Sequence, residues 1–198
     1  GIDPGFTSLG LSMIGVVKIS ENEVRKNYFH TTTVNLVSLL NEKRQAKSKR
    51  KLKPLKGNTG ISTSNKIKMA ELLYEQICLY SSQEKWDHTY ICIEYQAEKF
   101  KKNHNWFKVL LEQLGGYFGK DNVHSMTTTR MKKYFNIESG KGVRTVNKAL
   151  SQTFWYSSDW KCPSPSMRAE PSTHDEIEAS LFAIASLSLD YGLKINSS

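Results

Sequence analysis

The first ten residues constrain the fold of this chain more than any other segment, and they read Gly1-Ile2-Asp3-Pro4-Gly5-Phe6-Thr7-Ser8-Leu9-Gly10. Asp3 ends a short apolar stretch, and Pro4-Gly5 turns the backbone sharply, so that a second strand from Leu9 can fold back beside the first. Such a hairpin leaves the Asp3 carboxylate at the end of a sheet, where it can hold a hard cation such as Mg²⁺. An Asp followed by Gly is also typical of an ordinary turn, so this run alone does not decide between the two.

Three further acidic residues occupy positions that could join Asp3. Glu94 stands at the carboxyl end of the apolar, β-prone run Tyr90-Ile91-Cys92-Ile93. Asp175 and Glu178 are three residues apart near the C-terminus, so on a helix they share one face. Two-metal hydrolysis of a phosphodiester requires this density of negatively charged oxygen ligands. The order of the four carboxylates therefore predicts an acidic site that holds two metal ions.

The segment around Asp175 also has a purely structural interpretation. Asp175 and Glu176 each stand three residues after a hydroxyl residue and fit a capping box, so Asp175 could serve only to stabilise a helix start. Glu178 follows in a largely apolar stretch, where a carboxylate needs a partner or a metal. His174 could support a metal or a water molecule, or be an ordinary, partly exposed histidine. We expect Glu176 to be a surface charge.

Three motifs together resemble one known family. They are GIDPG at the start, IEYQ at residues 93–96 and HDEIEASLFAIA at residues 174–185. This set is similar to the RuvC family of Holliday-junction resolvases, within the RNase H-like superfamily. Asp3, Glu94 and Asp175 match the acidic positions of that family, and Glu178 stands where the family usually has a second Asp. The resemblance spans most of the chain, and the chain is a candidate member of the branch of this family that is found in large DNA viruses.

The resemblance implies a fold, an activity and an assembly. It implies one α/β domain over residues 1–198, with an RNase H-like, five-stranded mixed sheet flanked by helices. The implied enzyme depends on Mg²⁺ or Mn²⁺, with two ions held by the four carboxylates, and it cuts four-way DNA junctions in recombination, replication or repair. It leaves 5′-phosphates through paired symmetric nicks. Two opposed nicks are made naturally by a twofold homodimer, for which a helix at 103–118 is a candidate interface.

The hydrophobic pattern predicts the elements independently of that resemblance. Strands are expected at 1–4, 9–19, 23–30, 89–95 and 122–125, and helices at 65–82, 103–118, 130–135, 143–155 and 174–191. The segment 157–171 is expected to be a loop. A β-meander followed by alternating helices and strands is the RNase H-like order.

The net charge of +9 is concentrated in one segment. Eight basic residues and no acidic residue lie between Lys43 and Lys56, which leaves a net charge of +1 for the rest of the chain. We interpret residues 41–65 as a basic, flexible insertion whose lysines and arginines, such as Lys49, Arg50 and Lys51, grip DNA phosphates. A solvated loop and a nuclear-localisation-like patch are the alternatives.

Other candidate DNA contacts come from the resemblance and from interleaved basic and aromatic residues. The resemblance implies that Lys132 or Lys133, together with Arg144 or Lys141, contacts the phosphates of the strand that is cut. Arg144 stands where the family has Lys, and a guanidinium can clamp phosphate but is a poor proton donor. The basic and aromatic residues that follow the predicted strand suit base stacking beside phosphate contacts; they include Tyr95, Phe100, Lys101 and Lys102. Ala97 stands where bacterial relatives carry a Phe near the junction centre.

Composition argues against several other classes of protein. Cys78, Cys92 and Cys162 are widely separated, so neither a zinc knuckle nor a disulfide framework is indicated. No apolar run is long enough for a membrane span and no signal peptide is recognisable, so we expect a reduced intracellular compartment, in the cytoplasm, in the nucleus or at a viral replication site. Because the first residue is not Met, a few residues at the start of the first strand are expected to precede it.

Three alternative functions are open on the sequence alone. The turn after Asp3 also resembles the phosphate loop of actin-like ATPases, which need a second, duplicated domain. A non-catalytic nucleic-acid-binding module would explain the basic residues but not the ordered carboxylates. An RNase H or transposase activity would use the same carboxylates on a different substrate.

Overall fold

The computed structural model describes residues 1–5, 7–56, 61–82, 85–95, 101–137, 144–157 and 173–196. At its centre is a six-stranded sheet with the strand order β5-β4-β1-β2-β3-β6. The strands are β1 (Ile2–Asp3), β2 (Leu9–Lys18), β3 (Glu23–Val34), β4 (Ile91–Glu94), β5 (Val123–Met126) and β6 (Lys194–Asn196). β1, β2 and β3 form an antiparallel meander, β4 runs parallel to β1, and β5 runs parallel to β4. The sheet is therefore mixed, as predicted.

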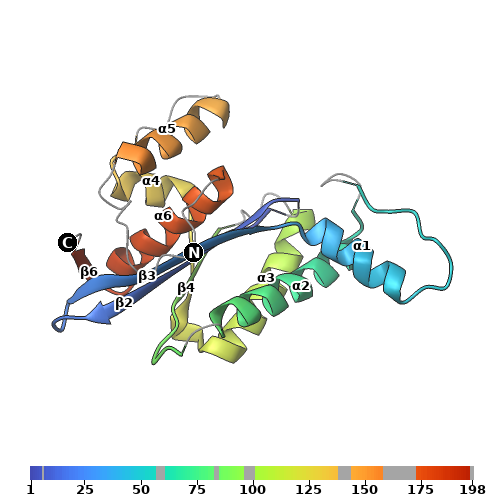
Figure 1. Cartoon of the computed structure of the whole chain (residues 1–198), viewed down its shortest axis with the longest axis horizontal. Helices are drawn as coiled ribbons and strands as arrows, with labels where there is room; N and C mark the ends of the chain where they lie inside the picture. The colour runs from blue at the N-terminus through green and yellow to red at the C-terminus, as the bar shows by residue number, and fades with distance from the viewer. Residues whose placement is uncertain are drawn as a thin grey trace.

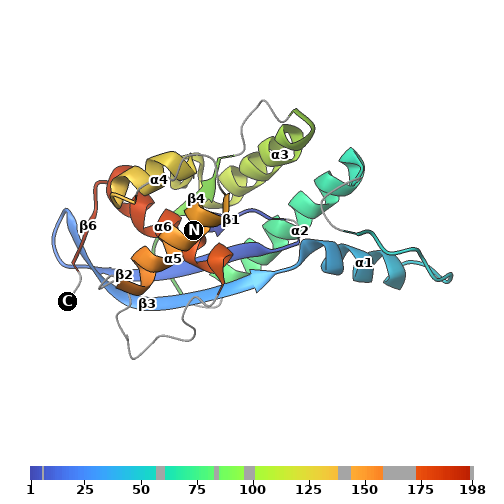
Figure 2. The same cartoon turned by 90° about the horizontal axis from the view of Figure 1, so that it is seen from above.

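Six α-helices flank this sheet within the described ranges. They are α1 (Leu36–Ala46), α2 (Thr63–Ser81), α3 (Lys101–Phe118), α4 (Thr128–Tyr134), α5 (Arg144–Ser157) and α6 (His174–Leu189). Figure 1 shows α4, α5 and α6 on one side of the strands and α2 and α3 on the other, with α1 continuing away from the sheet. Seen from above in Figure 2, α6 crosses the central strands and α5 lies over it. Among the described helices, none is both long and apolar enough to cross a membrane.

The alternation of side chains along the strands divides the core into two layers. Ile91 and Ile93 of β4 pack toward α2 and α3, whereas Cys92, between them, packs toward α4 and α6. Trp106 and Phe107 of α3 are buried in the first layer. Because β4 is covered on both faces, residues 91–93 are all apolar instead of alternating with polar residues.

Helix α1 and strand β6 are among the elements that were not predicted. Helix α1 occupies residues predicted partly as loop: Asn35 caps its start by accepting a hydrogen bond from the Ser38 main-chain nitrogen, and Leu36, Val37 and Leu40 bury one side of it. The described non-helical part of the segment 41–65 is therefore shorter than predicted. The final helix ends at Leu189, and the chain returns as β6, a sixth strand parallel to β3.

Candidate active site

Asp3 and Glu94 are neighbours because their strands are neighbours. Ile2 of β1 pairs with Ile93 of β4 in parallel register, so the next residue on each strand reaches the same end of the sheet. The two carboxyl groups therefore lie close enough for each to affect the ionisation of the other. Burial raises the pKa of Asp3 well above its ordinary value, and the charges of Glu94, Glu178 and Asp175 raise it further. The other three predicted carboxylates therefore all act electrostatically on Asp3.

The first turn of α6 brings Asp175 to this end of the sheet. Asp3 pairs with Gly10 across the hairpin, and a Cβ placed on Gly10 would overlap the main-chain carbonyl oxygen of Asp175. Gly1, two residues before Asp3, leaves room in the same way for the main chain of Ala179. Because these positions carry no side chain, helix and strands approach closely. Ser8, in the turn after Asp3, donates a hydrogen bond to Asp175 Oδ2.

The structure shows a capping box at the start of α6 that is formed by Thr173 and Glu176. Thr173 is the N-cap and accepts a hydrogen bond from the Glu176 main-chain nitrogen, while the Glu176 side chain accepts one from the Thr173 nitrogen. Glu176 also accepts a hydrogen bond from Thr33 of β3 at 2.7 Å. Glu176 is the capping residue and is only 6% exposed, so its prediction as a surface charge was wrong. The Asp175 side chain accepts a hydrogen bond from Ser8, and Ser172, its predicted partner in a capping box, lies outside the described residues.

Glu178 is buried one turn further along α6 and is held by three neighbours from three helices. Ser151 of α5 donates to Glu178 Oε1 at 3.3 Å, and Lys132 Nζ of α4 lies 3.8 Å from the same oxygen. His174 Nε2 lies 3.3 Å from Glu178 Oε2. Burial alone would raise the pKa of Glu178, but His174, Lys132 and Ser151 together outweigh burial and lower it. These three partners therefore favour the ionised form of Glu178.

A hydroxyl group also orients Glu94. Glu94 pairs with Met126 in β5, and Thr128 follows that strand by two residues and opens α4. Thr128 Oγ1 donates to Glu94 Oε1 at 2.6 Å. Sequence reasoning missed Thr128, Ser8 and Ser151, because an isolated hydroxyl residue has no pattern that links it to a distant carboxylate.

The donor chemistry of this site fits a hard divalent cation. Carboxylate oxygens are the preferred ligands of Mg²⁺ and Mn²⁺, and a cation would remove the repulsion that raises the pKa of Asp3. Among the described residues, no three His, Cys, Asp or Glu side chains form a group that could hold one ion together. Asp175, Glu94 and Glu178 each bond to a different hydroxyl residue instead. The predicted ligands thus lie near one another, but their side chains do not converge on one metal position.

The predicted DNA-contact residues are distributed unevenly. Lys132 is 6% exposed and belongs to the acidic site, whereas Lys133, next to it, is exposed. Tyr95 is 37% exposed directly after Glu94, and its ring meets the edge of Phe107 with centroids 6.1 Å apart. Lys49, Arg50 and Lys51 are exposed on the segment that follows α1. Phe100, Lys141 and the side chains of Lys101, Lys102 and Arg144 lie outside the described residues.

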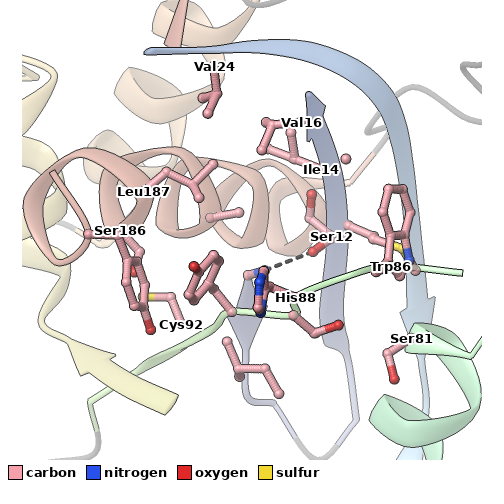
Figure 3. Close-up of a pocket in the computed structure, with 18 of the residues that line it drawn as sticks. Ser12, Ile14, Val16, Val24, Ser81, Trp86, His88, Cys92, Ser186 and Leu187 are labelled. Atoms are coloured by element: carbon pink, nitrogen blue, oxygen red, sulfur yellow. Dashed lines mark hydrogen bonds between the residues drawn. The ribbon is translucent and has the colours of Figure 1, made fainter. Parts of the chain in front are cut away.

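A separate pocket of about 940 Å³ lies at the opposite end of the central strands. Figure 3 shows some of the residues around it, among them Ser12, Ile14 and Val16 of β2 and Trp86 and His88 of the segment before β4. None of the four acidic residues lines this pocket. It is therefore distinct from the acidic site, and Cys92, whose pKa burial raises to about 11, faces it as a free thiol.

Comparison with known proteins bears on the fold alone. No protein-family model matches the sequence, and no curated protein matches it. Among solved structures, the chain is similar to the Thermus thermophilus RuvC structure, with a TM-score of 0.50 and 14% sequence identity over 97% of this chain and 95% of that one. The likeness extends over both chains almost completely, and it shows the fold. The chain has a RuvC-like, RNase H-like fold, with the acidic cluster at the end of β1 and β4.

Proposed function

We propose that this protein is a divalent-metal-dependent endonuclease that cuts branched DNA, with the four-way junction as its preferred substrate. The observation that carries the proposal is that Glu94, Asp175 and Glu178, from β4 and α6, all act on the partly buried Asp3 of β1. A fold similar to that of a RuvC structure supports the same activity. We further propose that residues 1–198 work as one nuclease domain and that two copies act together, since symmetric resolution requires two opposed nicks.

The chemistry follows from the donor set. Asp3, Glu94, Asp175 and Glu178 would hold two Mg²⁺ or Mn²⁺ ions. When bound, the ions would supply an activated water molecule and stabilise the leaving 3′ oxygen, which would give a product with a 5′-phosphate. Ser8 donates a hydrogen bond to one carboxylate oxygen of Asp175, and Thr128 donates one to one carboxylate oxygen of Glu94. Each bond fixes the orientation of its carboxylate and therefore of the second oxygen. The role of these hydroxyl residues is orientation of a ligand, a contribution that commonly matters as much as a ligand itself.

Lys132 is the residue best placed to act on the scissile phosphate. Its ammonium group is buried beside Glu178, so it is held in a low-dielectric site instead of moving in solvent. A fixed positive charge at this place would stabilise negative charge that develops on the phosphate. We propose that Lys133, Lys141, Arg144, Lys101 and Lys102 bind flanking phosphates and that Tyr95 or Phe100 stacks on a base near the branch point.

One comparison of substrates tests the activity. Purified protein is incubated with a labelled four-way junction, a duplex of the same sequence and an RNA–DNA hybrid, each with Mg²⁺, Mn²⁺ or EDTA. We expect nicks at symmetric positions in the junction, dependent on metal and absent in Asp3→Asn. Preferred cutting of the RNA strand of the hybrid would replace the proposal with an RNase H activity. Metal-dependent binding without cutting of any substrate would leave a nucleic-acid-binding module.

A further inference from the structure

The basic segment after α1 is bound to that helix by two amide side chains. Asn41 Nδ2 donates to the Leu55 carbonyl oxygen at 3.1 Å, and Asn41 Oδ1 accepts from the Leu55 nitrogen at 2.8 Å. One turn later, Gln45 Oε1 accepts from the Leu52 nitrogen at 2.9 Å, and its Nε2 donates to the Arg50 carbonyl oxygen at 3.1 Å. Each amide thus uses both its donor and its acceptor on the main chain of the segment. Residues 50–55 are held along α1 and do not form a free loop.

The side chains of this segment are divided into two groups. Leu55 packs against the core layer that contains α1 and α2, and Leu52 is half-buried. The basic side chains point outward and are exposed: Lys47, Lys49, Arg50, Lys51, Lys53 and Lys56. Within the part of the chain that the structure describes, none of these six forms an ion pair or a side-chain hydrogen bond. Lys43 differs, because it bonds to Glu75 of α2 at 2.5 Å and so fixes α1 to its neighbour.

The strand register places the root of this arm at the acidic end of the sheet. Thr33 pairs with Gly10, which pairs with Asp3, so these residues form one row across three strands. Helix α1 begins three residues after Thr33 and leads away from that row. Figures 1 and 2 both show α1 and the segment 47–56 forming one end of the long axis of the molecule. A nucleic acid cut at the acidic site would therefore pass the base of the arm.

We propose that α1 and residues 47–56 form a rigid, preorganised arm, the basic arm, that binds the phosphate backbone of duplex DNA outside the active site. This proposal rests on the proposed function for the choice of DNA as the polyanion. The six exposed cations would release counterions from the duplex, and they would contact phosphates without reading bases. Because Asn41 and Gln45 already order the main chain, binding costs less conformational entropy than it would with a flexible basic tail.

Two kinds of variant separate charge from rigidity. Lys49→Gln with Arg50→Gln and Lys51→Gln removes three arm charges, and its control removes three exposed charges from the other end of the sheet, in Lys18→Gln with Arg25→Gln and Lys85→Gln. Asn41→Ala with Gln45→Ala removes the amide bonds and keeps every charge, while alanine preserves the helix. Ser38→Ala, at an exposed position of α1, is its control.

The experiment measures the affinity of each variant for plain duplex at several salt concentrations in EDTA. The charge variant should flatten the dependence of log affinity on log salt by about 0.9 for each phosphate that the arm no longer neutralises, and its control should not. The amide variant should keep the wild-type slope but bind about tenfold more weakly, because it must order the arm on binding. Limited trypsin digestion should cut residues 47–56 faster in the amide variant than in the wild type or in Ser38→Ala.

Each alternative has its own outcome. Equal slopes for the charge variant and its control would overturn DNA binding by the arm, and equally fast trypsin cleavage in wild type and amide variant would overturn its rigidity. Arm-dependent binding to phosphatidylserine vesicles with an unchanged DNA slope would assign the surface to a membrane and also overturn the proposal. Duplex binding in EDTA needs no cleavage, so these results do not depend on whether the wild type cuts junctions. Failure of the nuclease proposal is detected separately, by the junction-cleavage assay.

Discussion

The main chain of Gly10 lies directly against the main-chain carbonyl of Asp175, with no space for a side chain between them. Gly10 is also the hairpin partner of Asp3. A single residue of β2 therefore fixes the separation between the strand that carries one acidic residue and the helix that carries two others. The position of the acidic cluster depends on this contact as much as on the carboxylates themselves.

Gly10→Ala should displace the first turn of α6. The added Cβ meets main-chain atoms, which cannot move aside as a flexible side chain can, so we expect a loss of about 1–3 kcal/mol in the free energy of unfolding. A displacement of Asp175 by about 1 Å should lower junction cleavage by about 100-fold. Chemical denaturation and single-turnover cleavage measure the two effects.

Gly116→Ala is the matched control for that substitution. Gly116 lies in α3, and a Cβ there would meet nothing within 4 Å. Alanine should therefore stabilise the helix by about 0.5–1 kcal/mol, because glycine costs backbone entropy in a helix interior. If Gly10→Ala behaved like Gly116→Ala, close packing of α6 would not be what positions Asp175.

Asp3→Asn should stabilise the metal-free protein at neutral pH. Because the folded protein raises the pKa of Asp3 above its ordinary value of 3.8, stability from this group is present below that value and is lost as pH rises through the raised pKa. Asparagine removes this loss. We expect a higher melting temperature than wild type in EDTA at neutral pH, with a smaller difference in acid near the ordinary pKa.

Magnesium should reverse the order of the two proteins. Mg²⁺ should raise the melting temperature of the wild type by binding the folded state, whereas Asp3→Asn, which lacks a ligand charge, should show little response. The same variant should keep its affinity for the junction in EDTA. A lower melting temperature for Asp3→Asn in EDTA would contradict the repulsion among the carboxylates around Asp3.

Much of the sheet and of the acidic site could be predicted because their signals are local. The apolar runs that end in Asp3 and Glu94 are strands on neighbouring positions, and the spacing of Asp175 and Glu178 places both on one helix. The order of the elements predicted an RNase H-like sheet, which the structure confirms. These features depend on hydrophobic period and on sequence order, both of which a sequence displays directly.

The missed features depend on tertiary contacts. Helix α1 has only a short apolar side, Leu36, Val37 and Leu40, and its second half is basic, so composition suggested a loop. β6 is three residues long and is defined by pairing with Glu23–Arg25. The prediction for Glu176 was wrong because its second partner, Thr33, is 143 residues away. A distant hydroxyl residue or strand edge gives no local pattern.

Lys132→Met should impair cleavage far more than Lys133→Met. Lys132 is buried 3.8 Å from Glu178, whereas Lys133 is exposed on the same helix. Removing the buried charge should lower single-turnover cleavage at saturating enzyme by about 100-fold or more. Lys133→Met should act mainly on affinity, through a surface charge that salt screens. Equal reductions for the two variants would remove Lys132 from the proposed active site.

Glu176→Ala should weaken the attachment of α6 to β3. The substitution removes the capping-box bond to the Thr173 nitrogen and the 2.7 Å hydrogen bond from Thr33. Leaving these partners unsatisfied should lower the free energy of unfolding by about 1–3 kcal/mol, measured by urea denaturation in EDTA. Cleavage should fall as well, because Asp175 and Glu178 lie on the same helix.

Glu176→Gln separates the hydrogen bonds from the charge. Glutamine keeps an acceptor for Thr33 and for the Thr173 nitrogen, and it also suits the capping position. We therefore expect this variant to retain most of the stability and most of the cleavage. If glutamine reduced cleavage as much as alanine while remaining folded, the charge of Glu176 would act in the chemistry directly. If alanine reduced neither stability nor cleavage, the row Asp3, Gly10 and Thr33 would hold α6 without this anchor.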